Sequence, residues 1–253
     1  MEEVICSLYD KYKMYMCEKS LPDIIPIDAT EYNINNSFAF LKEEFVYQNP
    51  IPIYYDRKLF KYEKQFFKSI LYHEFTHIYD IHTGLKEIND KNIFTLLTST
   101  YSEYHASQIE LLSQINPYSI TMAIDNLNSN SEMVYKDEHL NLNQYLIIPL
   151  ADFTSVLNNN RESYKKLSEY EFTRQYVNVE KSIMYYLGKY DTCKLFASGN
   201  IFYLLEKNCP MFLEDIEKIH VILNNKKSIY NRICDLEDAV LNFQNHYYSY
   251  FLR

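Results

Sequence analysis

The chain has 253 residues, with 34 Asp and Glu residues against 25 Lys and Arg residues, and a formal net charge of −9 at pH 7. A nucleic-acid-binding protein needs a basic surface to meet the phosphate backbone, so this acidic balance argues against that class. Apolar residues make up 47% of the sequence, which is enough for one large or two smaller cores, and three Gly residues exclude collagen-like and Gly-rich classes.

The cysteines and the first residues indicate where such a chain functions. The cysteines are odd in number and widely spread, and no Cys-x-x-Cys pair occurs, so we expect free buried thiols in a reducing compartment. The five are Cys6, Cys17, Cys193, Cys209 and Cys234. The start Met1-Glu2-Glu3-Val4 lacks the basic segment and apolar run of a signal peptide, and no apolar run reaches membrane-spanning length. We therefore expect a cytoplasmic protein without a membrane partner.

Residues 2–59 predict one helix followed by short strands. Apolar residues recur at near-helical spacing over residues 2–18, which indicates an amphipathic helix. Three short β-type runs follow at 25–27, 38–40 and 51–55, separated by Asn-rich and Pro-containing turns. They predict a small sheet of about three strands, and their prolines place at least one strand at an edge.

Residues 62–83 predict a single helix that ends at Gly84 and contains a His-Glu-x-x-His motif. Residues four apart lie on the same face of an α-helix, so His73 and His77 can direct their imidazoles to one point. Two ring nitrogens about 2.0–2.1 Å from a common centre form half of a tetrahedral zinc site. Glu74, beside that point, suits a carboxylate that takes a proton from metal-bound water.

A purely structural interpretation would place both His on a partly buried face, satisfied by local hydrogen bonds. The flanking residues argue against it, because they predict a helix that is buried on more than one side. They are Phe66, Phe67, Ile70, Leu71, Phe75, Ile78 and Ile81. Three titratable groups in such a helix are costly unless something compensates them, and a metal ion is the natural compensation.

A catalytic zinc site also needs a third protein ligand and an open fourth position for water. A third His ten residues after the first, with a Gly between, is one arrangement, but Thr83 and Asp80 occupy those positions. The other is a Glu on a following antiparallel helix, which the sequence predicts over residues 92–115. Glu103 is our choice on that helix and Glu110 the reserve. A solvated helix residue is the alternative interpretation of Glu103.

Two segments together resemble a known class of enzymes. Tyr72-His73-Glu74-Phe75-Thr76-His77, followed by Ser102-Glu103-Tyr104-His105-Ala106-Ser107, resembles the gluzincin clan of zinc metallopeptidases. More narrowly, the chain is similar to the ImmA/IrrE-type peptidases of phages and mobile elements, over about residues 25–112. In that family an Asn commonly follows the Ala, and Ser107 departs from this pattern.

This resemblance implies a zincin-like core, in which a small antiparallel sheet precedes the active-site helix. It makes His73, His77 and Glu103 the zinc ligands and Glu74 the general base. It also implies that the substrate is a repressor or another regulatory protein.

The second half of the chain carries weaker signals. Residues 126–138 are polar and predict a surface loop or lobe boundary, and Gly188 predicts a helix stop. Helices are expected at 143–158, 162–188, 190–207, 210–224 and 226–251. We therefore predict an α+β, mostly α-helical fold with a zincin-like metallopeptidase core at 1–120 and a helical C-terminal lobe at 121–253.

The function predicted is that of a zinc-dependent endopeptidase acting on a protein or peptide. A second donor should stabilise the oxyanion of the tetrahedral intermediate, and the sequence leaves several candidates open. These are His105, Tyr101, Tyr104, Tyr185 and Tyr186, the tyrosines having packing as the alternative role. Asp80 and His82 are either partners that orient a ligand His or solvated residues at the helix end.

Two other classes stay open. In one, the zincin core is catalytically inactive and serves as a scaffold for a binding or inhibitory protein that docks a partner. In the other, the metal centre is that of an amidase acting on a non-peptide substrate. Hydrolysis of a peptide library by the purified protein separates these classes.

Overall fold

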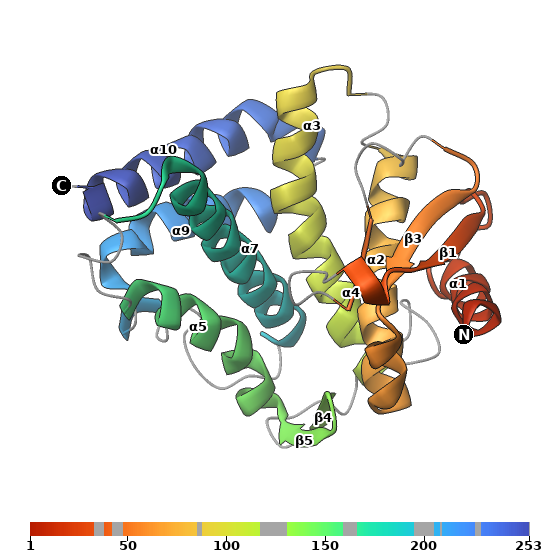
Figure 1. Cartoon of the computed structure of the whole chain (residues 1–253). Coiled ribbons are helices and arrows are strands. Elements are labelled where there is room, and N and C mark those ends of the chain that lie inside the picture. Colours follow the sequence, from red (N-terminus) through yellow and green to blue (C-terminus); the bar gives the residue numbers. More distant parts are fainter. Residues whose placement is uncertain are drawn as a thin grey trace. The chain divides into compact units, whose positions relative to one another are not determined.

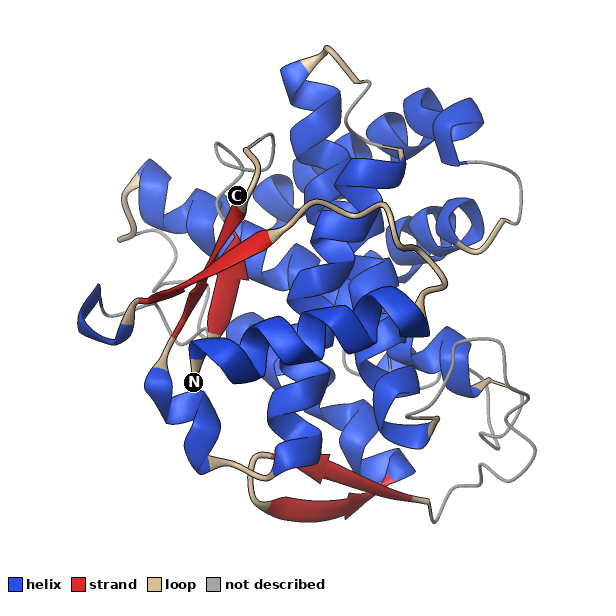
Figure 2. Cartoon of the chain, turned by 90° about the vertical axis from the view of Figure 1, so that its right-hand side faces the viewer, coloured by secondary structure: helices blue, strands red, loops and turns tan. Residues whose placement is uncertain are grey.

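The computed structural model of the chain describes residues 1–32, 38–41, 48–84, 88–116, 131–158, 166–194, 205–207, 209–225 and 229–252. Helices dominate these residues and two small sheets accompany them, which confirms the expected α+β, mostly helical class (Figures 1 and 2). The contacts divide the chain into two compact units. Unit 1 is Met1–Asn89 with His105–Tyr145, and unit 2 is Asp90–Tyr104 with Leu146–Arg253. The boundary predicted at residues 120 and 121 lies outside the described residues.

Unit 1 begins with helix α1 (Glu2–Tyr15), which ends three residues earlier than the predicted segment. Its buried residues follow the spacing of one helical face, and α1 packs on helix α2 (Lys64–Thr83). The Tyr12 hydroxyl donates to Thr76 Oγ1 at 3.0 Å, and its ring meets Tyr72 and Phe75 edge to face. This contact fixes the side of α2 that faces the hydrophobic core.

The three predicted strands are present as β1 (Ile24–Asp28), β2 (Ala39–Leu41) and β3 (Ile51–Tyr55), in the order β1-β3-β2. The expected antiparallel sheet is wrong for β1. β2 runs antiparallel to β3, but β1 runs parallel to it.

The prolines of this sheet occupy places where strand pairing permits them. Pro26 lies in β1, which is an edge strand as predicted. Pro52 lies in the central strand β3, but β2 pairs only with β3 residues from Ile53 onward. Among the residues that the structure describes, Pro52 thus pairs with β1, opposite Ile25.

Helix α2 follows the short 3-10 helix η3 (Arg57–Lys61), which Asp56 caps by accepting a hydrogen bond from the Lys58 amide. It begins two residues later than predicted, and Gly84 caps its end. The expected burial on more than one side is confirmed. The fully or nearly fully buried apolar residues of α2 are Phe66, Phe67, Leu71, Tyr72, Phe75, Ile78 and Ile81.

The helix predicted over residues 92–115 consists of three parts. Asp90 caps helix α3 (Lys91–Leu97), a π-helical turn follows at Thr98–Ser102, and helix α4 (Glu103–Ile115) completes the segment. A π turn shifts the rotation of the residues that follow it, and such turns occur frequently at functional sites. Here it ends directly before Glu103. The boundary between the two units crosses α4 after Tyr104, so the helix that Glu103 begins continues into unit 1.

The polar segment predicted as a loop at 126–138 is wrong over its second part. Strands β4 (Glu132–Tyr135) and β5 (Glu138–Asn141) form an antiparallel hairpin there, and residues 117–130 lie outside the described residues. Met133 and Val134 are buried in β4, and Lys136 takes the left-handed conformation that closes the tight turn.

Unit 2 is built from helices α5 (Leu142–Asn158), whose first turn belongs to unit 1, α7 (Glu169–Cys193), α9 (Leu213–Leu223) and α10 (Ile233–Leu252), with short 3-10 turns before α9 and α10. A capping box of Ser168 and Glu171 begins α7. The predicted stop at Gly188 is wrong, because α7 continues past it to Cys193 and Gly188 is buried within the helix. Of the helix predicted at 190–207, residues 195–204 lie outside the described residues.

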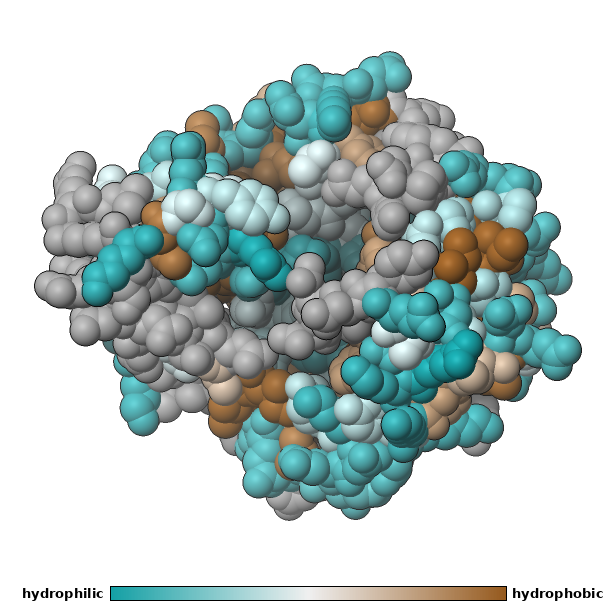
Figure 3. Space-filling view, in the orientation of Figure 1, coloured by the Kyte–Doolittle hydropathy of each residue, from teal (hydrophilic) through white to brown (hydrophobic). Residues whose placement is uncertain are grey.

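The hydrophilic surface and the free state of the cysteines agree with the composition. None of the described helices combines the length and apolar character that crossing a membrane requires. Hydrophilic residues cover much of the face seen in Figure 3, and apolar residues form small separate patches. All five cysteines are free, as expected, but the expected burial is wrong for three of them. Cys193 and Cys209 are buried, whereas Cys6 is half-buried and Cys17 and Cys234 are exposed.

Candidate metal centre

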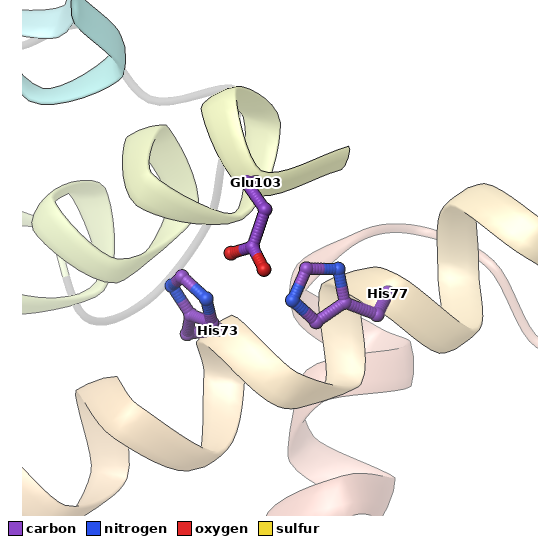
Figure 4. Close-up of side chains that lie close together, drawn as sticks. All are labelled: His73, His77 and Glu103. Atoms are coloured by element: carbon purple, nitrogen blue, oxygen red, sulfur yellow. The ribbon is translucent and has the colours of Figure 1, made fainter. Parts of the chain in front are cut away.

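His73, His77 and Glu103 form a group whose candidate ligand atoms all lie within 4.8 Å of one another. Figure 4 shows the two imidazoles on one side of α2 and the Glu103 carboxylate directed toward them from α4. Ligand atoms of a tetrahedral zinc site are about 3.3 Å apart when the metal–ligand distances are about 2.0–2.1 Å. The three residues are thus a group that could hold a metal ion.

The α-helix itself accounts for half of this arrangement. His73 and His77 are four residues apart on α2, and their ring centroids are 5.1 Å apart with the rings nearly perpendicular. His73 is 5% exposed and Glu103 is 4% exposed, whereas His77 is half-buried. Two imidazole nitrogens and one carboxylate oxygen are a donor set typical of catalytic zinc, and burial of these groups favours a compensating cation.

Glu110, the reserve ligand, lies behind His73. Its Oε2 is 3.3 Å from His73 Nδ1, and both side chains are buried. The other ring nitrogen, Nε2, is thereby left on the side of the ring opposite to Glu110. A carboxylate on the outer nitrogen of a ligand His fixes the tautomer and the orientation of the ring. Glu110 therefore lies against His73 and is not a member of the group of His73, His77 and Glu103.

A chain of buried polar side chains extends from Glu110 into unit 1. The Tyr145 hydroxyl donates to Glu110 Oε1 at 2.8 Å, and Gln114 Nε2 donates to Tyr145 Oη at 3.2 Å. Gln114 also donates to Ser69 Oγ at 3.1 Å and accepts from the Val134 amide at 3.0 Å. These bonds join α2, α4, β4 and the first turn of α5, so the position of Glu110 is set from several elements.

His105, which is half-buried, and the buried Asp80 form a second pair on the same two helices. His105 Nδ1 lies 2.7 Å from Asp80 Oδ1. Burial lowers the pKa of His105, but the charge of Asp80 and its hydrogen bond outweigh this effect, so the pKa is raised above its ordinary value. Asp80 therefore orients His105, one of the predicted oxyanion donors.

The tyrosines proposed as oxyanion donors differ in their surroundings. Tyr104 is buried, and its hydroxyl donates to Asp191 Oδ2 at 2.5 Å. Asp191 also accepts from His220 Nε2 at 2.8 Å, so Tyr104 belongs to a polar cluster of unit 2. Tyr186 is buried as well, while Tyr101 and Tyr185 are half-buried. The contacts of Tyr104 favour the structural role for this residue.

Glu103 has a cationic neighbour within unit 2. Lys181 Nζ, on α7, lies 2.6 Å from Glu103 Oε1. Glu74, the predicted general base, is half-buried on α2 directly after His73.

The sequence predicted the three grouped side chains but not most of the residues that surround them. Glu110 lies seven residues after Glu103 and therefore on the same face of α4, so helical spacing alone indicates its proximity. Gln114, Tyr145 and Lys181 belong to no motif, and nothing in the sequence pattern singles them out.

Comparison of the chain with known protein families, with curated proteins and with solved structures finds no match.

Proposed function

We propose that the chain is a zinc-dependent endopeptidase of the gluzincin type. The observation that supports this most directly is the grouping of His73, His77 and Glu103, with ligand atoms within 4.8 Å of one another and Glu74 next to His73. The resemblance of both motif segments to ImmA/IrrE-type peptidases supports the same conclusion, and with it a zincin-like core.

In this proposal metal binding, proton transfer and oxyanion stabilisation are assigned to different side chains. His73, His77 and Glu103 would hold the ion, and zinc bound there would lower the pKa of a water toward about 7 and polarise the scissile carbonyl. Glu74 accepts the proton of the attacking water and passes it to the leaving amine. His105, oriented by Asp80 and with a raised pKa, is the donor best suited to the developing oxyanion.

The substrate class follows from the resemblance alone. Peptidases of this type often cleave a repressor or another regulatory protein, so we propose a protein substrate of that kind.

One observation supports a second candidate. The Lys181 ammonium neutralises Glu103 without any metal, which is also what a catalytically inactive zincin-fold scaffold requires. In that case the folded chain would bind a partner protein and hydrolyse no peptide.

Glu74→Gln tests the proposed mechanism. The amide keeps the shape of the side chain but does not accept the proton. We therefore expect the rate of peptide hydrolysis to fall at least about a hundredfold. Zinc content and thermal unfolding should remain those of the wild type. Glu237→Gln, an exposed residue of α10, removes the same charge far along the chain and serves as the control. Full activity of Glu74→Gln would exclude this mechanism.

A further inference from the structure

Lys181 is the cation that the structure places against the third candidate ligand. Its Nζ lies 2.6 Å from Glu103 Oε1, within the range of a strong charge-assisted hydrogen bond. The Glu103 side chain is 6% exposed and the Lys181 side chain 41% exposed. The pair therefore joins a buried carboxylate to an ammonium that still reaches solvent.

A second carboxyl group stands beside this pair. Glu180 precedes Lys181 on α7 and is buried. Burial raises the pKa of Glu180 to about 7; Tyr176 and Lys181 act to lower it, and the negative charge of Glu103 acts to raise it. Lys181 thus has two buried carboxyl groups near it, and it compensates negative charge that burial makes costly.

A metal ion and Lys181 are two cations that depend on the same carboxylate. Without metal, the ammonium stabilises the ionised form of Glu103. With metal, a divalent ion and the ammonium lie near one carboxylate and repel each other. Binding of zinc therefore either proceeds against this repulsion or displaces the Lys181 ammonium into solvent. The second course is open because the Lys181 side chain is already partly exposed.

We propose that Lys181 is a built-in counter-cation of the metal centre, which stabilises the metal-free state and thereby weakens the affinity for zinc. This inference rests on the proposed metal centre and adds to it a residue from the helical second half of the chain. Its consequence is a site that releases its metal more readily than the same three ligands would alone.

The sign of the effect is opposite to that of a supporting residue. Removing a residue that merely orients Glu103 weakens zinc binding, whereas removing a competing cation strengthens it. Because the ammonium is partly exposed, solvent screens the repulsion, and we expect zinc affinity to increase about tenfold in Lys181→Met rather than by many orders of magnitude.

The test is zinc affinity, measured on the full chain by competition with a chromophoric chelator after removal of metal. We expect Lys181→Met to bind zinc about tenfold more tightly and its metal-free form to unfold at a lower temperature. Lys181→Arg keeps the charge and should stay within about threefold of the wild type. Arg174→Met removes an exposed cation from the same helix and should leave the affinity unchanged.

Three results would overturn the inference. Unchanged affinity in Lys181→Met would show that the two cations do not compete, and weaker affinity would show that Lys181 orients Glu103. Should Lys181→Met fail to fold, Lys181→Gln provides the same comparison. A folded wild-type chain that binds no zinc would overturn the metal centre itself, and with it both proposals.

Discussion

Behind His73 the interior of unit 1 contains a connected chain of polar side chains, whereas the interior of unit 2 around Phe212 consists of aromatic rings in contact. In unit 1, Glu110, Tyr145 and Gln114 are each bonded to the next. In unit 2, Phe212 is fully buried, and its ring centroid lies within 6.5 Å of those of Phe243, His246, Tyr247, Tyr250 and Phe251.

The two interiors should respond differently to substitution. Aromatic packing contributes mainly to the stability of the fold, since its value lies in buried area and close contact. A buried polar chain that ends on a ligand His contributes to the orientation of that ligand as well. Changes in the polar chain of Glu110, Tyr145 and Gln114 should therefore alter metal binding more than stability, and changes near Phe212 should alter stability alone.

The largest effect on zinc binding is expected from His77→Ala. Loss of one of three protein ligands leaves an incomplete donor set, so stoichiometric zinc binding should disappear. The half-buried position of His77 limits the cost to the fold. Zinc titration together with thermal unfolding checks this. Retention of zinc at wild-type affinity would remove His77 from the site.

Phe212→Ala should have the largest effect on stability. Truncation of a fully buried aromatic ring lowers the free energy of unfolding by about 3–5 kcal/mol. Chemical denaturation measures this loss, and zinc affinity of the folded fraction serves as the second readout. A drop in zinc affinity comparable to that of a ligand variant would contradict the separation between the two interiors.

Glu110→Gln, in contrast to Phe212→Ala, should weaken zinc binding more than it lowers stability. The amide is nearly the size of the carboxylate but carries no charge toward His73 Nδ1, so zinc affinity should fall about 10- to 100-fold. Tyr145→Phe removes the hydroxyl that donates to Glu110, and its effect on affinity should be smaller and in the same direction. If both variants bind zinc as the wild type does, the polar chain has only a structural role.

The smallest effect concerns an exposed pair of contacts in unit 1. His139 Nδ1 lies 2.7 Å from Glu132 and Nε2 lies 2.6 Å from Glu63, and these bonds raise the pKa of His139 above 6.5. The stabilisation is fully present below about pH 6.5 and disappears as the pH rises through the raised folded-state pKa. His139→Gln should therefore lower the melting temperature at pH 5.5 more than at pH 8.5. NMR titration of His139 measures its pKa directly, and an ordinary or lowered value would refute this.

The predictable parts of the molecule are those that depend on local periodicity. The helical spacing of His73 and His77 and the three short strands follow from residue patterns within one element. The mixed sheet did not follow, because strand direction depends on pairing between strands far apart in the sequence rather than on the residues of each strand. The helix stop predicted at Gly188 is absent, because burial in a packed helix overrides the weak helix propensity of glycine.

The supporting residues of the site were beyond local patterns for a related reason. The π-helical turn before Glu103 carries no distinctive residue, although it sets the rotation at which α4 begins. Lys181 lies 78 positions after Glu103 and meets it only through the fold. The same holds for Tyr145 and Glu110, which are 35 residues apart.

Metal content of the purified, tag-free protein tests the central claim most directly. The proposal predicts one zinc ion per folded chain, which chelation removes and which His73→Ala does not bind. A folded wild-type chain that takes up no zinc, even after addition of excess metal, would contradict it.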